Sequence, residues 1–277
     1  MHDTAPFGTY APTGFVRWAI ERTRAFSANW ISWRLLFLLR RMVAAVLRGA
    51  PVDVEALGAR MRLYPYNNIC EKKVLFTPQF FDPEELELLR ARMHEGFTFV
   101  DVGANIGAYT LFVGALAGPS AQILAVEPQA DVFDRLTYNI QLNPHGTIKA
   151  VDCAVADKPG ELTMFVDPRN RGESSVKIVG SSQAPTVRVA AKTLLELLKD
   201  EGFSHVDAVK LDVEGAEDII LEPFLRDAPP ELRPQLLIIE DGSRQWQTDL
   251  PALLEATGYR LVVKTRLNFV YELAAAA

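Results

Sequence analysis

The chain has few of the residues that several common protein classes require. Its 277 residues include two cysteines, Cys70 and Cys153, and neither lies in a CxxC pair or a Cys/His cluster, so we expect no zinc site. Such sparse cysteine favours a reducing compartment, and we expect a cytoplasmic protein. The four histidines form no motif, and a G-x-S-x-G element is missing, which argues against a serine hydrolase.

Long apolar runs are also missing. No apolar stretch approaches the roughly 20 residues of a membrane-spanning helix, and the N-terminus shows no signal-peptide pattern. The 17 glycines and 17 prolines are scattered rather than gathered in a low-complexity segment. The net charge of −6 argues against a nucleic-acid partner.

The charge is unevenly distributed. Residues 1–50 contain seven arginines and two acids, a net charge of +5, so the rest of the chain carries −11. Residues 15–48 are predicted to be helical, with arginines at seven-residue spacing that fall on one helix face, namely Arg17 and Arg24, then Arg34, Arg41 and Arg48. We expect this helix to pack on its own domain or on a second subunit. The alternative is a basic amphipathic helix on a membrane surface, which would make the protein peripheral to a membrane.

Beyond the helix, residues 51–81 are predicted to be a short β-rich connector. We therefore divide the chain into an N-terminal helical extension and connector, 1–70, and a catalytic domain, 71–277. The sequence Asp82-Pro83-Glu84-Glu85 predicts a helix start, with Asp82 as cap and Glu85 completing a capping box.

Strands and helices alternate in the rest of the chain. Seven strands of one sheet are predicted, at 98–102, 122–126, 147–151, 206–211, 235–239, 260–264 and 268–272, with a further hairpin strand at 162–166. Helices are predicted at 106–117, 132–142, 194–198, 216–225 and 250–257. This order indicates an α/β fold with a mostly parallel sheet, and the last two strands are close enough to pair antiparallel. The polar segment 167–190 is predicted to be either a lid or binding loop, or a surface excursion.

A glycine turn follows the first of these strands, in the sequence FVDVGANIG at 99–107. Gly103 and Gly107 leave room for a ligand beside the backbone, and Asn105 tolerates a left-handed conformation. Asp101 places a carboxylate next to the turn. The G-x-G-x-x-G spacing of dinucleotide-binding folds is absent, so an acid beside the turn favours a cationic ligand such as the methionine end of S-adenosylmethionine.

Carboxylates also follow the later strands. Glu127 can accept hydrogen bonds from both hydroxyls of a ribose. In the sequence KLDVEGAE at 210–217, Asp212 or Glu214 could take a proton from an acceptor hydroxyl, whereas Glu217 is better explained as a helix cap. Glu240 and Asp241, after the next strand, could form a metal site with Asp212, but strand-end acids more often bind substrate or cap helices, so we expect no metal.

These stretches resemble the FkbM family of methyltransferases over roughly residues 72–273. The resemblance rests on FVDVGANIG, on AVEP at 125–128, on KLDVEGAE and on CAVAD at 153–157. It implies a class I, Rossmann-like fold with an antiparallel sheet edge, S-adenosylmethionine as cofactor, and usually O-methylation. By position, the turn from Asp101 through Gly103, Ala104 and Asn105 to Gly107 would hold the methionine part. Glu127 would hold the ribose, and Asp152 or Cys153 would lie near the adenine.

We therefore expect a methyltransferase that acts on a hydroxyl of a sugar, glycolipid or natural product, with Asp212 and Glu214 as catalytic candidates. The alternatives are an NAD-dependent oxidoreductase and a non-catalytic, membrane-attached relative. Absence of G-x-G-x-x-G counts against the first. The intact acidic turn at 212–217 counts against the second.

Overall fold

The computed structural model describes residues 5–145, 147–166, 174–175 and 186–274. Its α-helices are α1 (Gly14–Arg24), α2 (Trp30–Leu47), α3 (Ile69–Phe76), α4 (Pro83–Arg90), α5 (Ala108–Leu116), α6 (Ala130–Gln141), α7 (Leu194–Asp200), α8 (Glu217–Asp227) and α9 (Leu250–Ala256), with short 3-10 turns at Pro78–Phe80 and Pro230–Leu232. Its strands are β1 (Val52–Ala56), β2 (Ala59–Leu63), β3 (Thr98–Val102), β4 (Gln122–Val126), β5 (Thr147–Val151), β6 (Ala154–Val155), β7 (Gly160–Val166), β8 (Ser174–Ser175), β9 (Thr186–Lys192), β10 (Ala208–Leu211), β11 (Leu236–Glu240), β12 (Tyr259–Lys264) and β13 (Asn268–Leu273). No helix in these ranges is long and apolar enough to cross a membrane.

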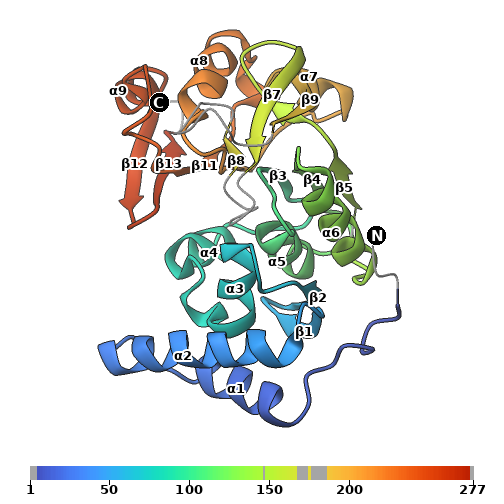
Figure 1. Ribbon diagram of the computed structural model, residues 1–277. Helices are drawn as coiled ribbons and strands as arrows, with labels where there is room; N and C mark the ends of the chain where they lie inside the picture. Colours follow the sequence, from blue (N-terminus) through green and yellow to red (C-terminus); the bar gives the residue numbers. More distant parts are fainter. Residues whose placement is uncertain (1–4, 146, 167–173, 176–185, 275–277) are drawn as a thin grey trace.

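The main sheet has seven strands in the order β12-β13-β11-β10-β3-β4-β5 (Figure 1). The five strands from β11 to β5 are parallel, and β13 pairs antiparallel with both β11 and β12. This is the class I arrangement with an antiparallel edge that the resemblance predicts. The chain moves outward from β3 through β4 to β5 and then returns to the other side of β3 at β10. Ligands of open α/β sheets bind where the strand order reverses in this way, at the carboxyl ends of the strands.

The N-terminal region differs from the single helix predicted over 15–48. It forms two helices, α1 and α2, because a new helix begins after Asn29. Asn29 is the N-cap residue of α2 and accepts a hydrogen bond from the Ser32 amide at 2.9 Å. The connector contains the β1–β2 hairpin and also α3, which the sequence did not predict.

The predicted capping box at the start of α4 is wrong. Asp82 has a left-handed backbone (φ +38°) and makes no cap hydrogen bond; instead, its carboxylate accepts from the Tyr109 hydroxyl at 2.9 Å. Glu85 is buried and accepts from Thr265 and Asn268. Both acids are thus used in tertiary contacts between α4, α5 and β13.

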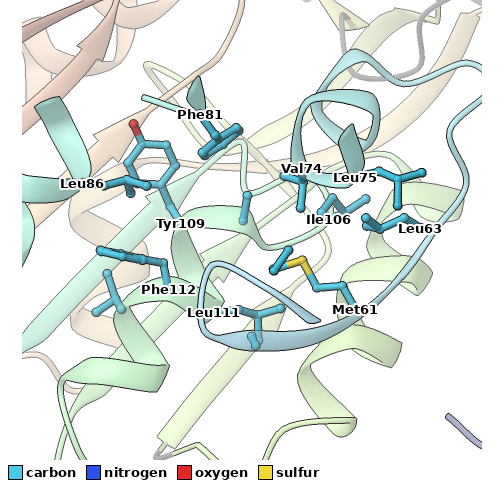
Figure 2. Packing of buried hydrophobic residues seen from close by; sticks show 14 of the residues in the cluster. Met61, Leu63, Val74, Leu75, Phe81, Leu86, Ile106, Tyr109, Leu111 and Phe112 are labelled. Atoms are coloured by element: carbon cyan, nitrogen blue, oxygen red, sulfur yellow. The ribbon is translucent and has the colours of Figure 1, made fainter. Parts of the chain in front are cut away.

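The N-terminal elements share one hydrophobic core with one face of the sheet. Figure 2 shows part of it: side chains of β2, such as Met61, meet Leu75 of α3 and Leu111 of α5. The opposite face of the sheet is covered by α7, α8 and α9, which contribute a second buried cluster. The N-terminal layer therefore supports the turn between β3 and α5. The division at residues 70 and 71 falls within α3 and stays a prediction.

The strands that follow β5 in the sequence form a smaller four-stranded sheet, in the order β6-β9-β7-β8. Most of the predicted lid or surface segment, 167–190, falls outside the described residues. Its last part forms the start of β9.

Candidate active site

A cleft opens at the carboxyl ends of the parallel strands. It consists of two adjoining cavities, which have Gly103, Asn105, Asp212 and Glu214 in common. We call them the β4 half and the β11 half. The β4 half is lined further by residues that include Glu127, Gln129, Cys153, Val155 and Met164. The β11 half is lined further by residues that include Lys73, Asp82, Asp101, Tyr109, Lys210, Glu240 and Asn268.

The glycine turn forms the wall common to both halves. Gly103 has φ +77°, and a Cβ atom there would lie 1.9 Å from the Asp212 carbonyl oxygen, so no other residue fits. The Gly103 and Ala104 amides both donate to the Val126 carbonyl, at 2.9 and 3.0 Å. Asn105 has φ +51°, and its side-chain oxygen accepts from Asn68 Nδ2 at 2.7 Å. The turn is thus held by contacts with the ends of β4 and β10 and with Asn68, the N-cap residue of α3.

Glu127 follows β4 and lies in the β4 half. Its two carboxylate oxygens accept from the backbone amides of Asn105 (2.9 Å) and Gln129 (3.0 Å). Each oxygen keeps a lone pair for a further donor. The side chain is buried, and this burial raises the pKa of Glu127 to about 7 against the opposing effect of the two amides.

Asp101 lies at the floor of the β11 half and is held by the start of α5. Its Oδ2 atom accepts from the Thr110 amide at 3.0 Å and from the Thr110 hydroxyl at 2.6 Å. Burial raises the pKa of Asp101 to about 6. Part of the role of Asp101 is therefore structural, because it joins β3 to α5.

Three carboxylates meet where the two halves join. Oxygen atoms of Asp212, Glu214 and Glu240 lie within 4.8 Å of one another. Glu214 has a left-handed backbone, φ +55°, an uncommon conformation for a residue with a side chain. The Asp212 side chain is 44% exposed to the cleft, and its Oδ2 atom lies 3.4 Å from the Lys210 ammonium.

The charges of this cluster are unequal. Burial raises the pKa of Glu240, and the nearby Asp212 and Glu214 carboxylates raise it further. Burial also opposes ionisation of Asp212, but the Lys210 ammonium and a hydrogen bond from Glu240 lower the pKa of Asp212. The two shifts are opposite, so they favour the protonated form of Glu240 beside the ionised form of Asp212.

Lys210 had no role in the sequence analysis beyond its place in a motif. It is 1% exposed, donates to the Leu211 carbonyl at 3.2 Å, and lies 5.6 Å from the centre of the Tyr109 ring. A lysine inside an otherwise apolar strand, between Val209 and Leu211, was the indication that the sequence offered, since buried lysines are almost always paired. Asp82 and Lys73 reach the cleft from the N-terminal layer, with no comparable sequence pattern.

Other predicted residues lie apart from the cleft. Gly107 does not line it; a Cβ atom at Gly107 would meet Leu136 of α6 at 2.8 Å. Asp152 is exposed and outside both sets of lining residues, whereas its neighbour Cys153 lines the β4 half. Asp241 is outside both sets of lining residues and contacts Ser243 and Lys264. The three-carboxylate group therefore contains Glu214 in place of Asp241.

Glu217 starts α8 and is buried. Its Oε1 atom accepts from the Val213 and Gly215 amides, and its Oε2 atom accepts from Trp246 at 2.7 Å. It stabilises the turn that carries Asp212 and Glu214. The predicted role as a helix cap is wrong, because the N-cap residue of α8 is Ala216 and no side chain caps the helix.

The β4 half fits the nucleoside part of S-adenosylmethionine. Glu127 offers two oxygens in a buried position, which suits two neighbouring ribose hydroxyls. Cys153, Val155 and Met164 are buried and give this half an apolar wall against which a purine can pack. The acid-rich junction at Asp212 suits the positive charge of a sulfonium.

Among curated proteins, the chain is similar to methyltransferase sdnD of Sordaria araneosa, with 31% identity over an alignment of 152 residues that covers 44% of this chain and 58% of that protein. It is also similar to hexuronic acid methyltransferase AglP of Haloferax volcanii, with 28% identity over 171 residues, which are 61% of this chain and 66% of that protein. The chain thus spans less than two thirds of the length of each relative.

Solved structures with a similar arrangement include the methyltransferase domain of METTL16, with a TM-score of 0.48, 14% identity, and coverage of 91% of this chain and 83% of that chain. A methyltransferase from Aquifex aeolicus that depends on S-adenosylmethionine aligns with a TM-score of 0.41, 15% identity, and coverage of 70% and 90%.

The model of the methyltransferase FkbM domain matches residues 101–261, which are more than half of the chain and include the glycine turn, Glu127 and the carboxylate cluster. This match decides against the dinucleotide-dependent oxidoreductase. The chain belongs to the FkbM-domain family of methyltransferases, which depend on S-adenosylmethionine.

Proposed function

We propose that the chain transfers a methyl group from S-adenosylmethionine to a hydroxyl of a sugar, glycolipid or natural product. The observation that supports this most directly is the carboxylate cluster at the junction of the cleft. It lies beside the half that fits the nucleoside, so an acceptor in the part of the β11 half away from Asp101 would meet both the methyl donor and a base.

The bound donor supplies an electrophilic methyl group, and the chain aligns it with the acceptor. In our proposal, the glycine turn from Asp101 to Asn105 holds the methionine part, Glu127 holds the ribose, and Cys153 lies beside the adenine. Asp212 accepts the acceptor's hydroxyl proton as the new bond forms. The raised pKa of Glu240 and the nearby Lys210 ammonium both favour the ionised form of Asp212 before that step. Glu214 is the second candidate for the base.

The acceptor class is supported by one relative and by the cations near the β11 half. The Haloferax relative is named as a hexuronic acid methyltransferase. Lys73 lines the β11 half and a neighbouring cavity, in which Arg40 and Arg266 lie together with the acids Asp82, Glu84 and Glu85. These cations could pair with the carboxylate of a hexuronic acid while one of its hydroxyls faces Asp212.

The test is methyl transfer from S-adenosylmethionine carrying a labelled methyl group to glucuronic acid, galacturonic acid, their nucleotide-linked forms and the methyl glycosides of neutral sugars. We expect labelled product that survives mild alkali, since an ether is stable there and a carboxyl ester is not. Alkali-labile product would show that the carboxylate is methylated and that no base is needed. Binding of donor without product from any hydroxyl compound would favour the non-catalytic alternative.

A further inference from the structure

Helix α2 presents a large apolar surface that nothing in the described part of the chain covers. Its inward side buries Leu36, Leu39 and Val43 against the domain, as the packing prediction required. Its outward side is apolar as well, with Trp30 67% and Phe37 65% exposed. In Figure 1, α2 lies along the outer edge of the molecule, on the far side of α3 from the sheet.

The exposed apolar residues are ordered along the helix. One row follows the spacing of a helix face at i, i+4, i+7, i+11 and i+15, and consists of Ile31, Leu35, Leu38, Met42 and Val46. We call this row the α2 stripe. Its members are between 36% and 62% exposed. Exposed hydrophobic residues scattered singly are ordinary, but a contiguous row indicates an interaction surface.

Cations lie beside the stripe. Arg34 and Arg41 of α2 and Arg48 at its end are all exposed and recur every seven residues, which places them in a second row. No acidic residue occurs between Glu21 and Asp53 in the sequence. This arrangement suits a partner that is apolar at depth and anionic at its surface.

A second copy of the chain fits this surface less well. In a symmetric pair, the same patch would face itself, so the arginine rows would approach one another without an acid to pair with. An anionic bilayer matches both rows: the stripe enters the boundary of the acyl chains, and the arginines reach the phosphates. Trp18 and Trp30, which are 52% and 67% exposed, are typical of the membrane–water interface.

We propose that α2 lies on an anionic membrane surface, with the α2 stripe buried at the boundary between headgroups and acyl chains. Attraction between the arginines and the lipid phosphates strengthens this binding.

This orientation also concerns the active site, and this step rests on the proposed function. Trp33 and Arg40 of α2 line a cavity of about 860 Å³. That cavity has Ile69, Lys73, Asp82 and Leu267 in common with the β11 half. Trp33 and Arg40 are each two residues from members of the α2 stripe, so they lie on the opposite side of the helix. A docked α2 would therefore leave the acceptor end of the cleft open away from the lipid surface.

The test is sedimentation of the full chain with vesicles of phosphatidylcholine alone and with vesicles that also contain about 30% phosphatidylglycerol, whose negative surface attracts basic segments. We expect binding to the anionic vesicles only, and weaker binding when salt is raised. The double variant Ile31→Glu, Leu38→Glu should bind at least tenfold more weakly. Leu261→Glu on β12, a residue 47% exposed, is the matched control and should bind like the unmodified chain.

Affinity for S-adenosylhomocysteine is measured on all three proteins and should be unchanged. If the unmodified chain does not bind S-adenosylhomocysteine, the proposed function is contradicted, but the vesicle-binding result still tests the membrane proposal. The membrane proposal is overturned if the unmodified chain ignores anionic vesicles, if the double variant binds them equally, or if light scattering shows a dimer that the double variant abolishes.

Discussion

The two halves of the cleft are lined by different kinds of chemical group. The β4 half consists of backbone turns at strand ends, apolar walls and one buried carboxylate, Glu127. The β11 half is lined by charged side chains, and Lys73 and Asp82 among them come from the N-terminal layer. A half made of fixed backbone recognises one constant ligand. A half made of side chains from several elements can vary with the acceptor and can hold groups of unequal acidity side by side.

The largest effect is expected for a variant of Asp212, which should lose turnover while it keeps its affinity for the donor. Replacing it with asparagine removes the proposed base but keeps the shape of the side chain, so we expect turnover to fall by about 10²–10⁴. Affinity for S-adenosylhomocysteine should change by no more than about threefold, roughly 0.7 kcal/mol. The measurement is single-turnover methyl transfer beside calorimetry.

Glu214→Gln is the matched comparison, because Glu214 belongs to the same cluster. Full turnover in both variants would mean that neither residue acts as the base, and the β11 half would then serve only to position the acceptor.

A smaller effect is expected in the β4 half. We expect micromolar binding of S-adenosylhomocysteine by the unmodified chain, about −8 kcal/mol, and at least a tenfold loss in Glu127→Ala. The reason is the loss of both ribose acceptors. Glu240→Gln should bind as the unmodified chain does, and equal affinities in all three proteins would contradict the assignment of Glu127.

Asp101→Ala sharpens the same comparison. We expect a tenfold loss of affinity here too, because Asp101 begins the turn that would hold the methionine part. The variant also loses the two hydrogen bonds from Thr110, so the free energy of unfolding should fall by about 1–3 kcal/mol. Denaturant titration measures this second effect. Unchanged stability would show that the Thr110 contacts contribute little.

The pH dependence of donor binding is expected to be smaller still. Ribose hydroxyls donate to the ionised form of Glu127, whose pKa in the folded protein is about 7. Affinity for S-adenosylhomocysteine should therefore fall several-fold as pH is lowered from 8 to 6. Glu127→Gln should bind weakly at both values, with a flat profile. A falling profile in that variant would assign the effect to another group.

The same pKa shift of Glu127 affects stability in the opposite direction: donor affinity rises with pH, whereas the free energy of unfolding falls. Between pH 4.5 and 7, the folded protein keeps a proton on Glu127 that the unfolded chain has lost, so the Glu127 contribution to the free energy of unfolding falls as pH rises. This part of the pH dependence should be absent from Glu127→Gln.

The smallest expected effect is that of a chelator. We expect EDTA to change methyl transfer by less than about twofold, because Lys210 already supplies a positive charge beside Asp212. Strong inhibition that magnesium reverses would instead assign Asp212, Glu214 and Glu240 to a cation.

The strands and the glycine turn were predictable because each depends on neighbouring residues. Apolar runs of four or five residues place β3, β4 and β10 almost to the residue. Gly103 is required by a contact with Asp212, but its motif is local and could be recognised.

The β11 half was less predictable for a physical reason. Asp82 precedes Pro-Glu-Glu, a local pattern for a helix cap, yet the buried Tyr109 hydroxyl needs an acceptor and takes its carboxylate. The outcome depends on how α5 packs on α4, which no window of sequence contains. For α2, helical spacing indicated an amphipathic segment, but which apolar residues stay exposed depends on how much of the helix α1 and α3 cover.

The position of β13 has a consequence for biosynthesis. It is made after β12 but lies between β12 and β11, and it pairs with both. While the chain is being translated, β12 has no strand of the sheet to join until β13 has left the ribosome. Until then β11 also keeps an open edge, with unpaired backbone groups that can recruit another nascent chain. The sheet is therefore completed by inserting one strand, β13, between two strands that are already made.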